Sequence, residues 1–556
     1  ASTKSGLWNA VSYFLETAFD IRWLWPGAGG EVVPQTEEVS WPLGTQVQRP
    51  DWLWRRQGLS GSFYMEQDFD LSWRARCGGT LTAAKEYDRW HRRMRMGGLN
   101  IADGHRWAEI CSPLEYGETH PEYFALVDGE RDTTYHNGKH RNQPCTSNRE
   151  VIQLVADYVL AQFRARPEMD GFSIATNDGS GFCECDECRR IDEWAGAEDS
   201  ATESAIDEVT AEWAPGGSGG IITDRMMKFA NDVGEIIEQE APGKMLLFLV
   251  YSVYRNPPRR VKLRANVLTQ FCTMSWSWCD PEIAETETGI LKKLDDYSQH
   301  IGVYDYLVNG ANGSMPRGFA RTTAQALKTM HHHGARYYAT QPGTDFALSG
   351  YGYYLLGRLL WNCRTEPKAV LDDFCRSGFG PAAPMVSAYL SAYCDRWEET
   401  KAVRRFNLPR MEQQIGRLYP ADWRKARCDE LRQAADLCAG IPEERERVRF
   451  LTKGLDFLDH LAAACEAATA LLDAGAPHPY DEEAAVQWVS NDPERATALS
   501  DKAVHERDRL VSWADAHRNH FIFAEVWFDY QRNFRGGLTG PWLDRIAAIA
   551  QRGQPE

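Results

Sequence analysis

Short apolar runs alternate with stretches of helical spacing between about residues 50 and 363. A run that is apolar without alternation is typical of a parallel strand covered on both faces, and apolar residues every three or four positions indicate amphipathic helices. Repeated units of this kind predict an α/β fold, a TIM-like (β/α)8 barrel. The predicted strands are WLWRRQ, LNIADGHRW, EYFALVDG, GFSIATND, KMLLFLVYSVY, NVLTQFCTM, HIGVYDYLVNG and ARYYATQPG. The predicted helices are Thr82–Met96, Asn148–Arg164, Arg225–Gln239, Ile283–Tyr297 and Thr322–His333.

The pattern changes on both sides of this predicted barrel, which we place at residues 50–363. Residues 1–49 begin with an amphipathic helix and continue into strand-like IRWLWPG, so we expect the remainder of a small α/β domain, truncated at its start. Residues 364–556 are rich in Ala, Leu, Glu and Arg at helical spacing, which predicts a C-terminal α-helical domain. Segment 193–223, acidic and then glycine-rich, is expected to be an insertion loop beside the site.

Charge and aromatic content narrow the class of partner. The 556 residues carry a formal charge of −17 without a long basic run, which argues against a nucleic-acid partner. The sequence has no apolar stretch long enough to span a bilayer, and its start has no signal-peptide apolar region. Aromatic residues make up 12% of the chain and suit the faces of sugar rings. We therefore expect an oligo- or polysaccharide substrate.

Two aspartates, one at the end of a predicted strand and one inside another, are candidates for catalysis. Asn177 and Asp178 abruptly end the run GFSIATND, and in α/β barrels catalytic side chains follow the carboxyl ends of strands. The alternative for Asp178 is an Asx turn that only shapes the bend. Asp305 interrupts an apolar run, where a carboxylate is costly unless it is paired or functional. Glycoside hydrolysis needs two carboxyls, unless the substrate supplies its own nucleophile, and these two form the candidate pair.

Other polar and aromatic side chains follow the predicted strands and should converge on the same face. The candidates for substrate binding are His105, Tyr251, Trp276, Tyr304, Tyr306, Gln341 and Asp345. Arg106 and Arg255, if they lie at the barrel mouth, would favour an anionic substrate. The run His331–His333 precedes a glycine at a predicted helix end, which favours a helix C-terminus over a metal site.

Three of the fourteen cysteines, Cys183, Cys185 and Cys188, lie in a Cys-x-Cys-x-x-Cys cluster. A fourth thiolate would complete a tetrahedral zinc site, and Cys145 is the natural candidate because it follows the preceding predicted strand. A structural zinc, a disulfide from Cys145 to one of the three, and free thiols are all compatible with the sequence. Four thiolates leave no open coordination position, so we expect no cofactor for catalysis.

Five segments occur together in a characteristic order: FLETAFDIRWLWPGAGGEVVP, RRMRMGGLNIADGH, HPEYFALVDGER, CTSNREVIQLVADYV and ATNDGSGFCECDEC. Over roughly residues 7–367 the chain resembles the bacterial domain of formerly unknown function that includes glycoside hydrolase family 163, endo-β-N-acetylglucosaminidases acting on complex N-glycans. The resemblance implies a TIM-like barrel preceded by a small α/β domain, in a secreted or periplasmic glycan-degrading protein. The chain departs from the family where its eighth strand has Thr340 and Gln341 in place of a Phe-Glu-Gln-like segment.

The resulting expectation is a glycoside hydrolase acting on N-acetylhexosamine-containing glycans, an endo- or exo-β-N-acetylglucosaminidase with retaining chemistry. In enzymes that use the acetamido group of the substrate, two adjacent polar residues typically end one strand. By that arrangement Asn177 would polarise the acetamido group and Asp178 would protonate the leaving oxygen. One alternative is a glycosidase of a uronic or sulfated polysaccharide that uses Asp178 and Asp305 as a pair. Another is a catalytically silent glycan-binding protein.

Overall fold

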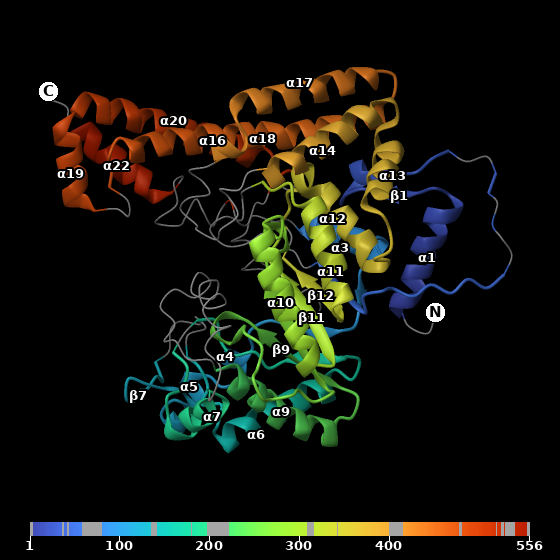
Figure 1. Ribbon diagram of the computed structural model, residues 1–556. Coiled ribbons are helices and arrows are strands. Elements are labelled where there is room, and N and C mark those ends of the chain that lie inside the picture. Colours follow the sequence, from blue (N-terminus) through green and yellow to red (C-terminus); the bar gives the residue numbers. More distant parts are fainter. Residues whose placement is uncertain are drawn as a thin grey trace.

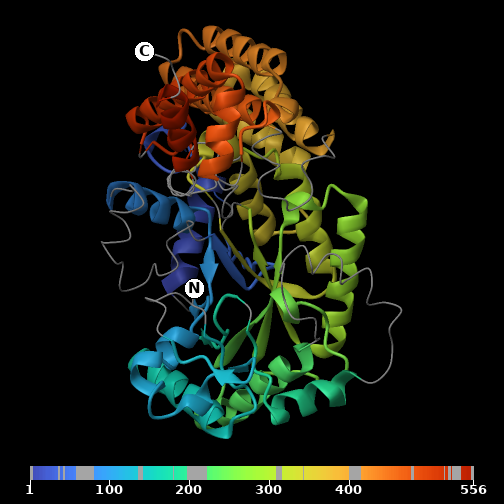
Figure 2. The same ribbon diagram turned by 90° about the vertical axis from the view of Figure 1, so that its left-hand side faces the viewer.

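A central curled sheet, helices packed around it and a helical C-terminal region make up the described chain (Figure 1). Figure 2 shows the strands running through the middle, with the C-terminal helices, in orange and red, stacked at one end. The computed structural model describes residues 4–35, 38–39, 41, 44–57, 81–134, 142–179, 181–196, 222–307, 316–341, 343–399, 415–477, 481–518, 520–523, 528 and 540–552.

The central sheet has eight strands in the order β4-β3-β12-β11-β10-β9-β8-β5. Seven of them are parallel, and β4 runs antiparallel to β3. These seven all fall within predicted strands, so that part of the prediction is confirmed. The bounds are β3 (Trp54–Gln57), β4 (Gly97–Gly98), β5 (Ile101–Ala102), β8 (Gly171–Ser173), β9 (Met245–Val250), β10 (Val267–Thr273), β11 (His300–Asp305) and β12 (Ala335–Thr340).

The predicted strand EYFALVDG is not part of this sheet. Its end, Leu126–Val127 (β6), pairs instead with Glu130–Arg131 (β7) in a separate antiparallel hairpin. Asp128 and Gly129 connect them with φ values of +50° and +84°. Two positive φ values in an Asp-Gly pair are typical of the tight turn that matches the twist of a hairpin. The turn therefore sends the chain straight back instead of across to a parallel neighbour.

The two edges of the central sheet belong to strands that are close in sequence. Gly98 ends β4 and Ile101 begins β5, so the edges lie no more than about 11 Å apart and the sheet must curl. Gly98 permits the close approach, because a Cβ there would come within 2.1 Å of the Leu53 carbonyl oxygen. No ladder joins β4 to β5 among the described strands. The α/β class is confirmed, and a closed eightfold barrel is not.

Most helices that cover the sheet follow its strands. All five predicted helices are present with ends within three residues of the prediction: α3 (Leu81–Arg93), α6 (Arg149–Ala165), α9 (Thr223–Glu240), α10 (Pro281–Tyr297) and α11 (Ala320–His332). The others here are α4 (Trp107–Ile110), α5 (Pro113–Tyr116), α7 (Asp186–Gly196) and the almost wholly buried α12 (Phe346–Trp361). The histidine run ends α11, and Gly334 follows it with φ +86°. Most of the predicted insertion, residues 197–221, lies outside the described residues.

Both flanks pack on the sheet through one hydrophobic core. The N-terminal segment contains α1 (Lys4–Ala18) and the antiparallel pair β1 (Arg22–Trp23) and β2 (Glu31–Val32). The described C-terminal region is helical, as expected, and the domain boundaries after residues 49 and 363 stay predictions. Its helices are α13 (Pro367–Phe379), α14 (Ala383–Glu399), α16 (Ile415–Leu418), α17 (Ala421–Leu437), α18 (Pro442–Asp473), α19 (Glu482–Asn491), α20 (Pro493–Ala516) and α22 (Pro541–Arg552).

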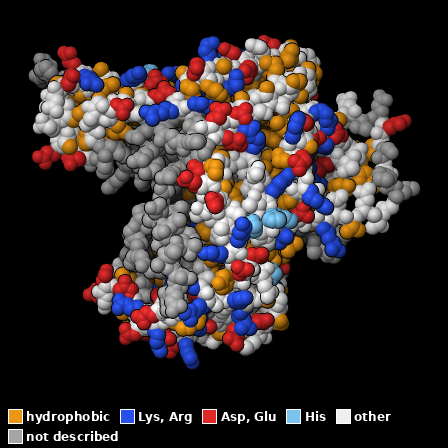
Figure 3. Space-filling model, viewed as in Figure 1, with side chains coloured by type: hydrophobic (Ala, Val, Ile, Leu, Met, Phe, Trp, Pro, Cys, Tyr) orange, Lys and Arg blue, Asp and Glu red, His pale blue; other side chains and the backbone are white. Residues whose placement is uncertain are grey.

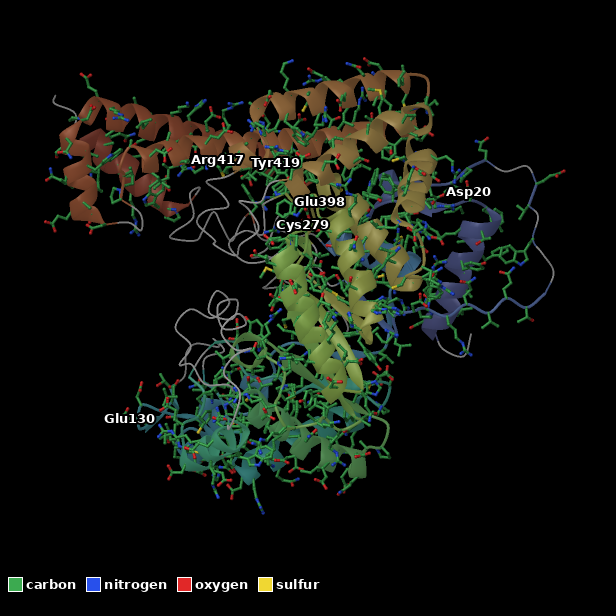
Figure 4. The ribbon with its side chains drawn as sticks, in the orientation of Figure 1. Asp20, Glu130, Cys279, Glu398, Arg417 and Tyr419 are labelled. Carbon is green, nitrogen blue, oxygen red and sulfur yellow. The ribbon has the colours of Figure 1, made fainter. Side chains whose placement is uncertain are left out.

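The junction between the helical region and the sheet contains direct hydrogen bonds. The Trp397 indole donates to the Trp276 carbonyl at 3.0 Å, and the Tyr419 hydroxyl donates to the Pro316 carbonyl at 3.1 Å. Figure 4 shows Cys279 and Tyr419 at this junction, far from Glu130 on β7. Acidic and basic side chains are intermixed over the face drawn in Figure 3. No described helix is both long enough and apolar enough to cross a membrane.

Candidate functional site

The carboxyl ends of the parallel strands bring most of the predicted site residues to one edge of the sheet. Strand register places Tyr304 beside Cys272 of β10 and Asp305 beside Thr340 of β12. His105 follows β5 and pairs by an isolated bridge with Ala175, just after β8. Because parallel strands end together at this edge, side chains from β5 round to β12 are in reach of one another. The contacts below establish which of them meet.

Asp178, Tyr251 and His105 form the first group of contacts. The Tyr251 hydroxyl donates to Asp178 Oδ1 at 3.0 Å, and its ring meets that of His105 edge-on, with centroids 5.9 Å apart. Asp178 is exposed, whereas Tyr251 and His105 are half-buried. Burial raises the pKa of Tyr251, and the charge of Asp178 raises it further, so the phenol is a protonated donor at neutral pH.

The backbone around these side chains is tightly specified. His105 Nδ1 lies 2.5 Å from the Thr176 carbonyl oxygen, which accepts its N–H and sets the orientation of the ring. Ser252, directly after Tyr251, has φ +53°, a left-handed conformation that is uncommon for a residue other than glycine. Strained residues of this kind cluster at functional sites, and this one follows Tyr251, the first residue after β9.

The second group contains two residues that the sequence analysis missed, Arg56 of β3 and Asp103 after β5. The Arg56 guanidinium donates to the buried Asp103 carboxylate. Both charges act on the pKa of Tyr304, which burial raises well above its ordinary value. Gln341 Nε2 donates to the Tyr304 hydroxyl at 2.7 Å. The sequence signal for Arg56 was its charge inside the strand-like run WLWRRQ, because a charged side chain in such a run is costly unless it is paired or functional.

Tyr306 packs against the second group and lies within electrostatic range of the first. Its ring lies edge-on to that of Tyr304, with centroids 5.0 Å apart. Burial raises its pKa, and the neighbouring Tyr251 and Asp178 contribute to the shift. Direct contacts thus join Asp178 to Tyr251, and Tyr304 to both Tyr306 and Gln341. These five residues form a constellation of aromatic and polar groups at the strand ends.

Asp305 lies in the interior and not in this constellation. Asp305 is only 1% exposed, and its Oδ1 accepts the Ser275 backbone N–H at 2.9 Å. Oδ2 accepts the Tyr338 hydroxyl at 2.7 Å. Burial raises the pKa of Asp305 to about 6. Both carboxylate oxygens are hydrogen-bonded, so this conformation gives Asp305 no access to a ligand.

Asn177 and Trp276 also lie behind the strand ends. Asn177 is buried, and its Nδ2 donates to the Asn142 carbonyl at 2.5 Å. Trp276 is 1% exposed and packs edge-on against Trp397 at 5.7 Å between ring centroids. A ring this deeply buried has no face to offer a sugar in this conformation, and the Asn177 amide already holds a backbone carbonyl.

Asp345 supports the start of α12. It is buried and accepts the hydroxyls of Tyr353 at 2.8 Å and Ser349 at 2.5 Å. Burial raises its pKa. These contacts lie within the first two turns of one helix and give the carboxylate a structural role.

The arginines expected at the mouth are paired inside the protein. Arg255 is fully buried and donates to both carboxylate oxygens of Glu287 at 2.5 Å. Arg106 is buried, and its Nη1 donates to Glu109 Oε1 at 2.6 Å. The expectation that these two residues offer their charge to an anionic substrate is wrong, because carboxylates of the protein already bind them.

The four predicted thiol ligands meet in space. The sulfurs of Cys145, Cys183, Cys185 and Cys188 all lie within 4.8 Å of one another, and the described cysteines form no disulfide. Two other described groups bring three potential ligands together, namely Asp51, His331 and Cys363, and the more exposed His120, Glu122 and Glu150. In the first of these, the Cys363 thiol accepts the Trp52 indole N–H and its backbone N–H donates to Asp51. Of these three groups, only the cysteine cluster brings four potential ligands together.

The fold and site define a mixed α/β protein with an aromatic and polar site at the carboxyl edge of a curled parallel sheet. The family model described as "Domain of unknown function (DUF4838)" matches residues 25–391. This match covers more than half of the chain, so the protein belongs to the DUF4838 family. It includes the whole central sheet and ends within α14. No curated protein matches the chain.

Proposed function

We propose that the protein is a glycoside hydrolase that cleaves a β-linked N-acetylglucosamine with retention, using the acetamido group of its substrate as nucleophile. One observation carries the proposal. Among the carboxylates at the strand ends of the described chain, Asp178 is exposed, whereas Asp103, Asp305 and Asp345 are 2%, 1% and 7% exposed and hydrogen-bonded to protein groups. A mechanism with one enzyme carboxyl fits this arrangement better than one with two.

The chemistry follows from that single carboxyl. A retaining enzyme with its own nucleophile needs a second carboxyl about 5–5.5 Å from the acid. In the substrate-assisted route, the acetamido oxygen attacks C1 while protonated Asp178 donates its proton to the leaving oxygen. Water then attacks C1, Asp178 takes a proton from it, and the acetamido group is restored. The Tyr251 hydroxyl holds Oδ1 of Asp178, so the transferred proton belongs to Oδ2.

The surrounding residues supply binding and positioning. Tyr251 and Tyr306, which are half-buried, give the site aromatic groups suited to a sugar ring, and the buried Tyr304 packs behind Tyr306. The Asn177 amide is committed to the Asn142 carbonyl, so we assign it the support of the Asp178 loop rather than contact with the acetamido group.

The resemblance to glycoside hydrolase family 163 supports this activity, because one of its five segments is the Asp178 loop itself. A glycan substrate and a secreted or periplasmic location are part of the same proposal. The alternative pairing of Asp178 with Asp305 on an anionic polysaccharide has less support, because Asp305 is buried and Arg106 and Arg255 are bound internally.

Product analysis by mass spectrometry tests the proposal. Wild-type protein and Asp178→Asn are incubated with N-glycoproteins, mucin-type glycans and acidic polysaccharides. Release of products ending in N-acetylglucosamine by the wild type, and not by Asp178→Asn, is expected. Asp157→Asn, an exposed aspartate on α6, is the matched control and should cleave like the wild type. Equal cleavage by Asp178→Asn, breakdown of acidic polysaccharides alone, or sugar binding without turnover would each overturn the proposal.

A further inference from the structure

We propose that Cys145, Cys183, Cys185 and Cys188 bind one structural zinc ion, which clamps the loop that carries Asp178. The sulfur positions carry this inference. Zinc–thiolate bonds of about 2.3 Å place the sulfurs of a tetrahedral site about 3.8 Å apart. The Cys145 and Cys185 sulfurs are 3.7 Å apart, and all four lie within 4.8 Å of one another. The set thus has the size of a single-ion site.

The cluster joins two segments that are distant in the sequence. Cys145 lies in the loop before α6, held by a 2.9 Å hydrogen bond from its N–H to the Tyr123 carbonyl. Cys183 and Cys185 precede α7, and Cys188 lies in it. Three of the four residues are buried, and Cys185 is half-buried.

Few other apolar side chains pack around these thiols. They form a hydrophobic cluster separate from the main core, whose other fully buried member is Ala125. Leu126 and Val127 of β6 pack against it. Small cores of this kind are ordinarily stabilised by a disulfide or a metal, and a bound structural ion contributes directly to folding. An ion here would tie the hairpin, the loop before α6 and α7 together.

Hydrogen-bond donors surround the sulfurs, as thiolates require. The Leu126 backbone N–H donates to Cys183 Sγ at 3.3 Å, and Arg131 Nη1 approaches the same sulfur at 3.6 Å. The Ser147 hydroxyl lies 3.2 Å from Cys188 Sγ. Four thiolates and a divalent ion carry a net charge of −2, which the donors and the Arg131 guanidinium offset.

The ligand set selects zinc and a structural role. Four sulfurs in tetrahedral reach suit zinc, whereas an iron–sulfur cluster spreads its cysteines over separate irons. With four protein ligands the ion has no open position for water or substrate. The inference therefore concerns stability and does not rest on the proposed function.

The ion would hold both sides of the Asp178 loop. On the far side, Cys183 is five residues after Asp178, and its carbonyl accepts Arg225 Nη1 at 2.5 Å. On the near side, Gln143 lies two residues before Cys145. Its Nε2 donates to the Asn177 carbonyl at 2.8 Å. The short segment that carries Cys145 thus contacts the Asp178 loop directly at Asn177. Through the ion it would also be joined to the other end of that loop, at Cys183.

Metal analysis of the purified full chain tests the inference. The wild type should contain about one zinc ion per chain, retained through desalting. Cys185→Ser and Cys145→Ser should lose it. Cys279→Ser is the matched control: Cys279 is half-buried like Cys185 but lies at the junction with the C-terminal helices (Figure 4) and should retain zinc.

A second measurement on wild-type protein covers variants that fail to fold. Removing the ion with a chelator should lower Tm, and adding zinc should restore it. After denaturation in chelator, all fourteen cysteines should react with a thiol reagent. The number of reactive cysteines should be lower by four while zinc is bound than after zinc has been removed. Absence of zinc, another metal in its place, or two thiols missing for each disulfide would overturn the inference.

Discussion

Asp178 and Asp305 both follow or end a strand of the same sheet, and each accepts a hydrogen bond from a tyrosine. The Tyr251 hydroxyl binds Asp178 at 3.0 Å, and the Tyr338 hydroxyl binds Asp305 at 2.7 Å. Asp178 is exposed on a loop, whereas Asp305 is buried and also accepts a backbone N–H. Two aspartate–tyrosine pairs of the same composition therefore lie in opposite surroundings.

The comparison shows that burial, and not the partner, separates a carboxyl that is open to a ligand from one that the protein encloses. At Asp305 the protein has replaced water with fixed donors, and burial still raises the pKa of the carboxyl to about 6. At Asp178 one oxygen is held by Tyr251 and the carboxyl remains open to a ligand. The following predictions test this difference.

The largest expected effect separates the two aspartates by activity. Asp178→Asn removes the proposed acid and should lower kcat/KM by about 10²–10⁴-fold with little change in Tm. Asp305→Asn should retain activity within about tenfold, because its side chain has no access to substrate. Steady-state kinetics on the glycan found by product analysis, with thermal unfolding of each variant, gives both readouts. A similar loss in both variants at unchanged stability would contradict the comparison.

The next effect is the pH dependence of stability. The pKa of Asp305 is about 6 when folded, against an ordinary value of 3.8, so between these values the folded state binds a proton that the unfolded state lacks. Stability from this group is present at low pH and is lost as pH rises from about 4 to about 6, by up to about 3 kcal/mol. Asp305→Asn should abolish this loss.

Denaturant unfolding of wild type and Asp305→Asn at several pH values measures the effect as a difference. His91 has the opposite sign, because burial lowers its pKa to about 3 and acid therefore destabilises the fold. His91 is present in both proteins and cancels in the difference. Asp178→Asn serves as the exposed control. A difference curve for Asp305→Asn that is flat across pH 4–6 would show that Asp305 is ionised throughout.

The strands and helices were largely predictable, because their signals are local. Apolar runs bounded by turn residues identified seven parallel strands, and helical spacing identified five helices. The prediction that EYFALVDG is a strand of the central sheet was wrong, because the Asp128–Gly129 turn reverses the chain within this apolar segment. Whether the sheet closes into a barrel was not predictable. The edge strand β4 consists of two glycines without a hydrophobic pattern, and its pairing with β3 depends on residues distant in the sequence.

The sequence predicted where the candidate site lies, but not the directions in which its side chains point. Strand ends correctly indicated where side chains converge, yet alternation along a strand stops at its last residue, so the directions of Asn177, Trp276 and Asp345 carried no sequence signal. The cysteines, in contrast, were predictable as a set: the close spacing of Cys183, Cys185 and Cys188 indicated a ligand cluster, and the position of Cys145 in a loop after an apolar run indicated the fourth member, which does meet the other three.

The smallest expected effect compares the tyrosines. Tyr338→Phe leaves the buried Asp305 Oδ2 without that donor and should cost about 1–3 kcal/mol of stability with little change in activity. Tyr251→Phe lets water replace the hydroxyl at exposed Asp178 and should change stability by less than about 0.5 kcal/mol. It should still lower kcat/KM by about fivefold to tenfold, because the carboxyl is then less well oriented. Unfolding and kinetics on the two matched variants measure both quantities, and a stability loss in Tyr251→Phe equal to that in Tyr338→Phe would place Asp178 among the structural carboxylates.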